Sequence, residues 1–222
     1  MVEGQLCDFM KQLIELAQKI KNEELRKKVV EFIKDPKLTH KDFKKYPSTK
    51  IEEARSIFTV SSPSGAASVE RDVLNHSIAL ADLCLKTAES IEKNYGIPIN
   101  KDNLLAAAIL HDLMKIFEYK KGKEGLEPTG ILLDHSMLAV AEFYHRGFPE
   151  QVIHIVASHF GESGPTPPRT FEALIFHYCD TLLSLIEFHL HGAKQTQQPV
   201  QLVLLDEEIL KKMTGEKTEE KS

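Results

Sequence analysis

The chain has 222 residues, and its 28 Lys and Arg against 33 Asp and Glu give a formal net charge of −5. Its 42% hydrophobic and 27% charged residues are typical of a globular protein and exclude collagen-like and wholly disordered classes. The acidic balance disfavours a dedicated nucleic-acid binder, which usually carries a basic excess. Three cysteines without a CxxC pair argue against a disulfide framework, so we expect a cytoplasmic protein.

The first 60 residues predict a helical segment that packs on the rest of the chain. Apolar residues between Phe9 and Ile20, and again between Leu25 and Ile33, recur at the three- and four-residue spacing of amphipathic helices. Residues 55–58 predict a short turn, and the small-residue stretch 61–68 (SSPSGAAS) predicts a loop. We expect neither a secretory leader nor a membrane span, which needs roughly 20 apolar residues.

The remainder of the chain predicts almost continuous helix. Helical apolar periodicity extends over residues 69–95, 103–117, 134–145, 149–159 and 171–191. We therefore predict an all-α bundle with its main domain at 61–192. Residues 193–213 form a C-terminal extension that begins either as a strand or as a helix, and 214–222 a disordered tail.

A histidine–aspartate pair interrupts a very apolar predicted helix, LLAAAIL-HD-LMKIF, at His111 and Asp112. A buried carboxylate beside an imidazole is costly unless something holds both groups. A divalent cation does so, because it binds neutral imidazole nitrogen and carboxylate oxygen together. Taken alone, the pair is explained equally well by hydrogen bonding at a helix surface.

Four more residues of metal-ligand type lie beside apolar faces of other predicted helices: His76, His135, His159 and Asp180. With the histidine–aspartate pair they place such a residue on five successive helices, as a metal site within a helical core requires. Of the other six histidines, His177 is a candidate to support a ligand. Asp134 either orients His135 or caps its helix.

The order and spacing of His76, His111-Asp112 and Asp180 resemble the HD-domain metal-dependent phosphohydrolase superfamily, with HDLMK where that family often has HDxGK. The segments GILLDH, SHFGESGPTPP and EALIFHYCD are similar to the HD domain of the YhaM-type 3′–5′ exoribonucleases. Those nucleases carry an N-terminal OB-fold, whereas residues 1–60 here predict helices. The motifs are closest to the YhaM-type domain, but without the OB-fold we expect a stand-alone HD hydrolase acting on a small phosphoester. The archaeal phosphodiesterases that open cyclic phosphate esters of dihydroneopterin are similar stand-alone HD proteins of this size.

The resemblance implies an HD-domain helical bundle with a metal site between its core helices. A first ion would be held by His76, His111, Asp112 and Asp180, and Asp112 would bridge to a second ion at His135 and His159. Phe160 stands where two-metal members often have another histidine, so either one or two ions are expected. Nitrogen and oxygen donors suit iron or manganese foremost, and also zinc, cobalt or nickel.

The implied activity is hydrolysis, by metal-activated water, of a phosphomonoester or a cyclic or linear phosphodiester of a small nucleotide-like or pterin-like substrate. Asp112 and Lys115 are the expected catalytic residues, because Lys115 shares a helix face with the pair and can meet a phosphate oxygen. Arg169 and Arg71 are further candidates for substrate binding.

Three alternatives remain open: a nucleotide sensor without turnover, an exonuclease-like phosphodiesterase, and a purely structural bundle. For partners we expect a small phosphorylated substrate and a homodimer, with neither a membrane nor a nucleic acid.

Overall fold

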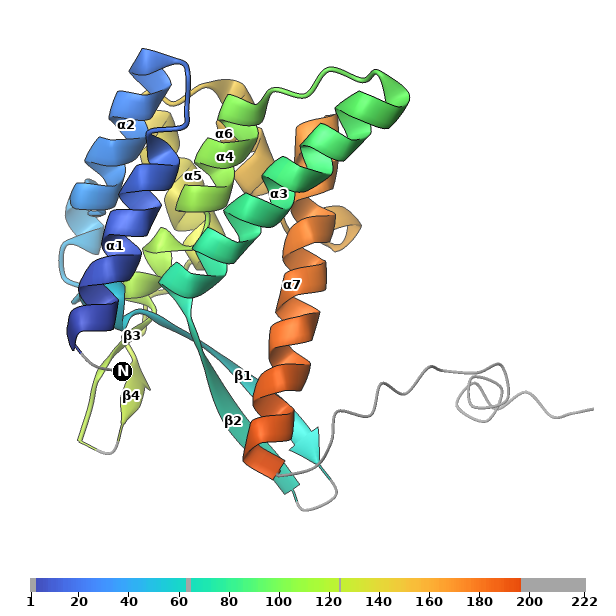
Figure 1. The fold of residues 1–222 in the computed structure, drawn as a ribbon. Helices are drawn as coiled ribbons and strands as arrows, with labels where there is room; N and C mark the ends of the chain where they lie inside the picture. Colours follow the sequence, from blue (N-terminus) through green and yellow to red (C-terminus); the bar gives the residue numbers. More distant parts are fainter. Residues whose placement is uncertain (1–2, 63–64, 124, 197–222) are drawn as a thin grey trace, which may run out of the picture.

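A computed structural model describes residues 3–62, 65–123 and 125–196. Its helices are α1 (Glu3–Ala17), α2 (Glu23–Lys34), α3 (Val73–Tyr95), α4 (Lys101–Leu110), α5 (His135–His145), α6 (Glu150–Ala157) and α7 (Phe171–Thr196). Its strands are β1 (Arg55–Ser62), β2 (Gly65–Asp72), β3 (Tyr119–Lys121) and β4 (Leu126–Pro128). The predicted tail, and the predicted extension beyond residue 196, lie outside the described residues. The helical bundle in Figure 1 confirms the all-α class.

Short polar side chains begin most of the helices. Asn22, Asp72, Asn100 and Asp134 each accept a hydrogen bond from a backbone N–H in the first turn of α2, α3, α4 and α5, respectively. These contacts satisfy N–H groups that have no partner within a helix. Gly96 ends α3 in the left-handed conformation, with φ of 69°, which glycine adopts without steric cost.

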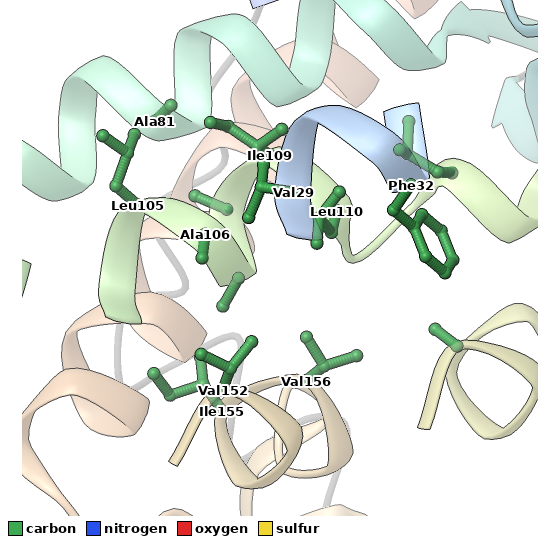
Figure 2. Close-up of a cluster of buried hydrophobic side chains, with 14 of the residues drawn as sticks. Val29, Phe32, Ala81, Leu105, Ala106, Ile109, Leu110, Val152, Ile155 and Val156 are labelled. Carbon is green, nitrogen blue, oxygen red and sulfur yellow. The ribbon is translucent and has the colours of Figure 1, made fainter. Parts of the chain in front are cut away.

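Helix α4 forms the centre of the bundle, and all of its residues from Asn103 to Leu110 are buried. It contacts α1, α2, α3, α6 and α7. Figure 2 shows Leu105, Ala106, Ile109 and Leu110 of α4 between side chains of the surrounding helices. Those neighbours are Val29 and Phe32 of α2, Ala81 of α3, and Val152, Ile155 and Val156 of α6. A helix enclosed on all sides has no polar face, which explains the uninterrupted apolar sequence of α4.

The turn predicted at 55–58 and the loop predicted at 61–68 are wrong for the described residues, because residues 55–62 and 65–68 lie in two paired strands. Strand β1 pairs antiparallel with β2 in continuous register from Arg55 opposite Asp72 to Ser62 opposite Gly65. The small residues of β2 carry little strand propensity, so pairing with β1 and contact with α7 supply what the local sequence lacks. The predicted boundary between residues 60 and 61 therefore falls inside β1. Figure 1 shows the hairpin running beside the later turns of α7.

Within the described chain, one segment is long and apolar enough to cross a membrane by length and composition alone, Phe171–Leu190 of α7. In the fold this segment contacts α3, α4, α6 and the β1–β2 hairpin. Its interior polar residues, Asp180 and Glu187, are directed to a cluster of charged side chains within the protein. Helix α7 therefore forms one wall of the polar cluster described next.

Candidate metal centre

The end of α4 places His111 and Asp112 beside each other. The single helix predicted over 103–117 is wrong, because α4 ends at Leu110 and a 3-10 helix begins at Leu113. Neighbouring side chains on a regular α-helix diverge by about 100°. At this break, His111 Nε2 lies 3.4 Å from Asp112 Oδ1 instead, so both side chains reach the same cluster.

His76, His111 and Asp180 form one group of potential ligands, contributed by α3, the end of α4 and α7. Their ligand atoms all lie within 4.8 Å of one another, and His76 Nε2 is 3.0 Å from Asp180 Oδ1. His76 and His111 are almost completely buried. Three helices distant in sequence thus converge on one point that could hold a metal ion.

Asp112 connects this group to two further histidines. Its Oδ1 is 3.3 Å from His135 Nε2, and the His135 and His159 rings have centroids 5.5 Å apart. The His111 and His159 ring centroids are 6.3 Å apart. The structure therefore brings together all six residues that the sequence predicts as ligands, with Asp112 between the two groups.

The orientation of each histidine is fixed through its Nδ1 atom. His111 Nδ1 lies 3.1 Å from the Ala108 carbonyl oxygen, and His159 Nδ1 lies 2.9 Å from that of Val156. His135 Nδ1 meets Glu118 Oε1 at 2.8 Å, and His76 Nδ1 meets Glu187 Oε2 at 2.9 Å. Carbonyl and carboxylate oxygens only accept, so each Nδ1 carries a proton and each Nε2 is the ring nitrogen directed to the cluster.

His111 Nε2 shows that the cluster fits a cation. This buried atom has no hydrogen-bond partner among the described residues. A buried polar atom without a partner costs about 1–3 kcal/mol. A metal ion would satisfy it, and a histidine held at Nδ1 by an acceptor is the usual arrangement of an imidazole ligand.

The ionisation states also suit a divalent cation. Burial lowers the pKa of His111 to about 3, and burial together with the nearby His135 lowers the pKa of His159. Burial alone would raise the pKa of Asp112, but electrostatic interaction with the nearby His111, Lys115, His135 and Arg71 holds that pKa well below its usual value. The neutral imidazoles of His111 and His159 beside the ionised carboxylate of Asp112 are donors that suit a transition-metal site.

Hydrogen bonds set the ionisation of the other two proposed ligands, His76 and Asp180. Burial disfavours the charged form of His76, but hydrogen bonds to Asp180 and Glu187 outweigh it and raise the pKa of His76. Burial also disfavours ionised Asp180, yet the hydrogen bond from His76 lowers the pKa of Asp180. The carboxylate at this end of the cluster is therefore ionised.

A cavity of about 480 Å³ opens against the cluster, within the usual range for small-molecule sites. Asp112, His135, His159 and Asp180 line it on the side of the cluster. The remaining lining is partly polar and partly apolar: Ser56, Ile57, Arg71, Lys115, Phe160, His177, Thr181, Ser184, Leu185 and Phe188. A ligand here would meet charged groups together with aromatic and aliphatic surface.

Two positively charged side chains, Lys115 and Arg71, border this cavity beside Asp112. Lys115 Nζ lies 3.0 Å and Arg71 Nη2 lies 3.1 Å from Asp112 Oδ2, and both nitrogens also contact the Ser56 hydroxyl. Both side chains are nearly buried. Asp112 is thus two-sided, with Oδ1 toward the histidines and Oδ2 toward the cations.

Other predicted residues occupy different places. Arg169 is exposed and is not among the residues that line the cavity, and its backbone N–H donates to His154 Nε2 on α6 at 3.0 Å. The structure therefore does not bring Arg169 to the site as we expected. Asp134 caps α5, the second of its two predicted roles, and His177 Nδ1 donates to the His159 carbonyl oxygen at 2.7 Å.

Sequence reasoning missed Glu187, Glu118, Ser56 and Ser184. Ser184 and Glu187 follow Asp180 by four and seven residues, which is the spacing of one helix face. Once Asp180 is predicted as a ligand, this spacing predicts that Ser184 and Glu187 lie on the same side of α7. Glu118 follows the 3-10 helix and Ser56 lies on the unpredicted β1, and their contacts depend on the tertiary fold.

Comparison with known proteins places these features in a family. The model of the HD domain matches residues 73–199, and the chain belongs to the HD domain family. This confirms the resemblance that the histidine–aspartate spacing indicated.

Two relatives illustrate the range of the family. The chain is 43% identical over 173 residues to the "Dihydroneopterin 2′,3′-cyclic phosphate phosphodiesterase" of Methanocaldococcus jannaschii, a match that covers 77% of this chain and 67% of the relative. It is 38% identical over 97 residues to the "3′-5′ exoribonuclease YhaM" of a Geobacillus species, covering 38% of this chain and 30% of the relative. No solved structure shows a significant match.

Proposed function

We propose that this protein is a metal-dependent phosphodiesterase that hydrolyses a small cyclic phosphate ester carrying a pterin-like or nucleotide-like group. The observation that carries this proposal is the unpartnered, buried Nε2 of His111 within a cluster that lines a cavity beside two cations. The identity to the dihydroneopterin cyclic phosphate phosphodiesterase supports the substrate class.

In this proposal His76, His111, Asp112 and Asp180 hold one divalent ion, with iron or manganese ahead of zinc, cobalt and nickel. A bound ion would supply a lowered water pKa and neutralise charge on the phosphoryl oxygens. His135 and His159, together with Asp112, could hold a second ion. Phe160 offers no ligand atom, and its ring packs on His159 with centroids 3.8 Å apart. Two ions therefore remain the alternative to one.

The charged residues of the cavity would bind and orient the ester. Lys115 and Arg71 supply positive charge against its phosphate, and Lys115 can contact a phosphoryl oxygen directly. Asp112 holds these cations in place through Oδ2. Ile57, Phe160 and Phe188 offer apolar surface for the organic part of the substrate.

Metal analysis and a substrate panel test this proposal. Purified protein should contain near-stoichiometric transition metal and hydrolyse members of a panel of dihydroneopterin cyclic phosphate, 2′,3′-cyclic nucleotides, bis-p-nitrophenyl phosphate and nucleoside monophosphates. Asp112→Ala should lose both metal and activity, whereas the control His145→Ala, an exposed position on α5, should keep both. Full activity in metal-free protein would refute the proposal.

The missing ligand at Phe160 favours one second candidate, a nucleotide sensor without turnover. Binding of a cyclic nucleotide, with no product under iron or manganese, would identify a sensor. Cleavage of a short RNA from its 3′ end would instead indicate the exonuclease-like alternative.

We further propose a cytoplasmic homodimer paired through α7. Seven large apolar side chains of α7 are each 40–56% exposed: Phe171, Leu174, Tyr178, Leu182, Leu185, Ile186 and Leu190. Their recurrence at three and four residues suits pairing with the same helix of a second copy. Two such faces would bury on the order of 1,200 Å² together, the lower limit for a stable interface. Light scattering should give a dimer for the wild type and a monomer for Leu182→Glu, and a monomeric wild type would contradict this pairing.

A further inference from the structure

Glu187 is a buried carboxylate of α7 with no part in the proposed ligand set. Only 9% of the residue is exposed, and it lies seven residues after Asp180 on the same side of the helix. Burial of an ionised carboxylate is costly unless its oxygens are paired. Its contacts therefore indicate why the fold retains it.

Both contacts of Glu187 Oε2 are to nitrogen atoms next to the metal centre. His76 Nδ1 lies 2.9 Å away and Arg71 Nη1 lies 3.1 Å away. Arg71 Nη1 is also 3.1 Å from His76 Nδ1. A guanidinium nitrogen only donates, so it can hydrogen-bond to Nδ1 only if that atom carries no proton.

The Glu187 carboxylate determines whether His76 Nδ1 donates to Glu187 or accepts from Arg71. Glu187 only accepts, so its short contact to His76 requires a proton on Nδ1. Arg71 Nη1 then donates to Glu187 Oε2 and to Ser184 Oγ, which lies 3.0 Å away. With a proton on Nδ1, His76 Nε2 is the ring nitrogen that faces Asp180 Oδ1 at 3.0 Å and lies within 4.8 Å of the His111 ligand atom, so it is the nitrogen that would exchange its proton for a metal ion.

The positive charge of Arg71 balances the negative charge of the buried Glu187 carboxylate. Its Nη1 contacts Glu187 and its Nη2 contacts Asp112, at 3.1 Å each. One guanidinium thus joins a carboxylate behind His76 to a carboxylate among the proposed ligands. The position of Glu187 is consequently coupled to that of Asp112 as well as to that of His76.

We infer that Glu187 is a positioning residue that fixes the tautomer and ring orientation of His76 for metal binding. This inference rests on the proposed metal centre and adds to it a residue that would not itself touch the ion. It predicts that the charge and the acceptor oxygen of Glu187 both contribute to metal affinity.

Cobalt titration of metal-stripped full-length protein tests this role. We expect Glu187→Ala to weaken Co²⁺ affinity by about 10–100-fold, measured against a competing chelator, because outer carboxylates commonly contribute this much. Glu187→Gln should fall between Glu187→Ala and the wild type, since its amide oxygen still accepts from His76. The visible ligand-field bands of bound Co²⁺ should shift in both variants. Glu89→Gln, at an exposed position of α3, is the matched control and should behave as wild type.

The outcomes separate this inference from the proposed function. Co²⁺ affinities and spectra of both Glu187 variants that match the wild type would overturn the positioning role and leave the metal centre intact. A wild type that binds no Co²⁺ would overturn the metal centre and this role with it. Thermal unfolding without metal monitors folding, and the isosteric Glu187→Gln carries the test if Glu187→Ala does not fold.

Discussion

Helix α4 joins two buried regions of opposite chemistry. Along the helix, Leu105 to Leu110 pack against aliphatic and aromatic side chains of α2, α3 and α6. Immediately beyond, His111 and Asp112 are equally buried, but they face other histidines, carboxylates and two cations. We call these regions the apolar end and the polar end of α4.

The two ends contribute differently to the protein. At the apolar end, burial itself is stabilising, by about 25 cal/mol for each Å² of apolar surface removed from water. At the polar end, burial is unfavourable unless each polar group is paired, and the Nε2 of His111 has no hydrogen-bond partner within the described chain. The apolar end therefore stabilises the fold, whereas the polar end is arranged for a ligand.

Replacing His111 by leucine should give the largest effect and the clearest separation between the two ends. The ligand is lost, and since a bound metal supplies several kcal/mol of transition-state stabilisation, we expect activity to fall by about 10³-fold or more. The metal-free variant should be at least as stable as the metal-free wild type, because an unpaired buried nitrogen has been removed. Activity assays and urea unfolding in chelator measure the two effects. A clear loss of metal-free stability would show that the polar end also stabilises the fold.

Phe32→Ala is the reciprocal change at the apolar end. Phe32 is fully buried and packs edge-on against Phe143, with ring centroids 5.0 Å apart. We expect a loss of about 3–5 kcal/mol in unfolding free energy, from lost burial and from the cavity left behind. Metal content and kcat of the folded fraction should stay near those of the wild type. Reduced metal affinity in that fraction would indicate that the two ends are coupled.

The two ends also differ in how far their structure could be predicted from sequence. The unbroken apolar run of α4 identifies a buried helix, and the interruption at His111-Asp112 identifies the polar end without any structure. Asp180 and Glu187 are seven residues apart and lie on one face of α7, so the sequence also allows Glu187 to be predicted at the polar end.

Other parts depended on tertiary contact. The small residues of β2 have no strand signal of their own, and the β1–β2 hairpin brings Ser56 to Lys115 across a long sequence separation. Glu118 reaches His135 only because a 3-10 helix follows α4. Such contacts depend on where elements pack, which local propensity does not determine.

Lys115→Met tests the cationic side of the polar end. The variant keeps the aliphatic length of the side chain but removes the ammonium beside Asp112 Oδ2. We expect kcat/KM to fall by about 100-fold, the usual effect of losing one donor to a transition-state oxygen, while metal content is retained. Lys86→Met, an exposed position on α3, is the control. Loss of metal together with activity would instead make Lys115 a support for Asp112.

The smallest effect expected is a pH dependence that belongs to the polar end alone. Burial lowers the pKa of His111 to about 3, from an ordinary value of 6.5 in the unfolded chain. Between these values the unfolded state binds a proton that the folded state does not, so stability falls as the pH falls below 6.5.

For metal-free protein, His111 alone should lower the unfolding free energy by about 2 kcal/mol between about pH 7 and pH 5. His111→Leu lacks this group, so over the same interval it should lose about 2 kcal/mol less than the wild type. Phe32→Ala keeps His111 and should follow the wild-type pH dependence, displaced to lower stability. Urea unfolding in chelator at the two pH values measures all three proteins. If His111→Leu and the wild type showed the same dependence, water would reach His111 in the metal-free protein, and the polar end would not be buried as the apolar end is.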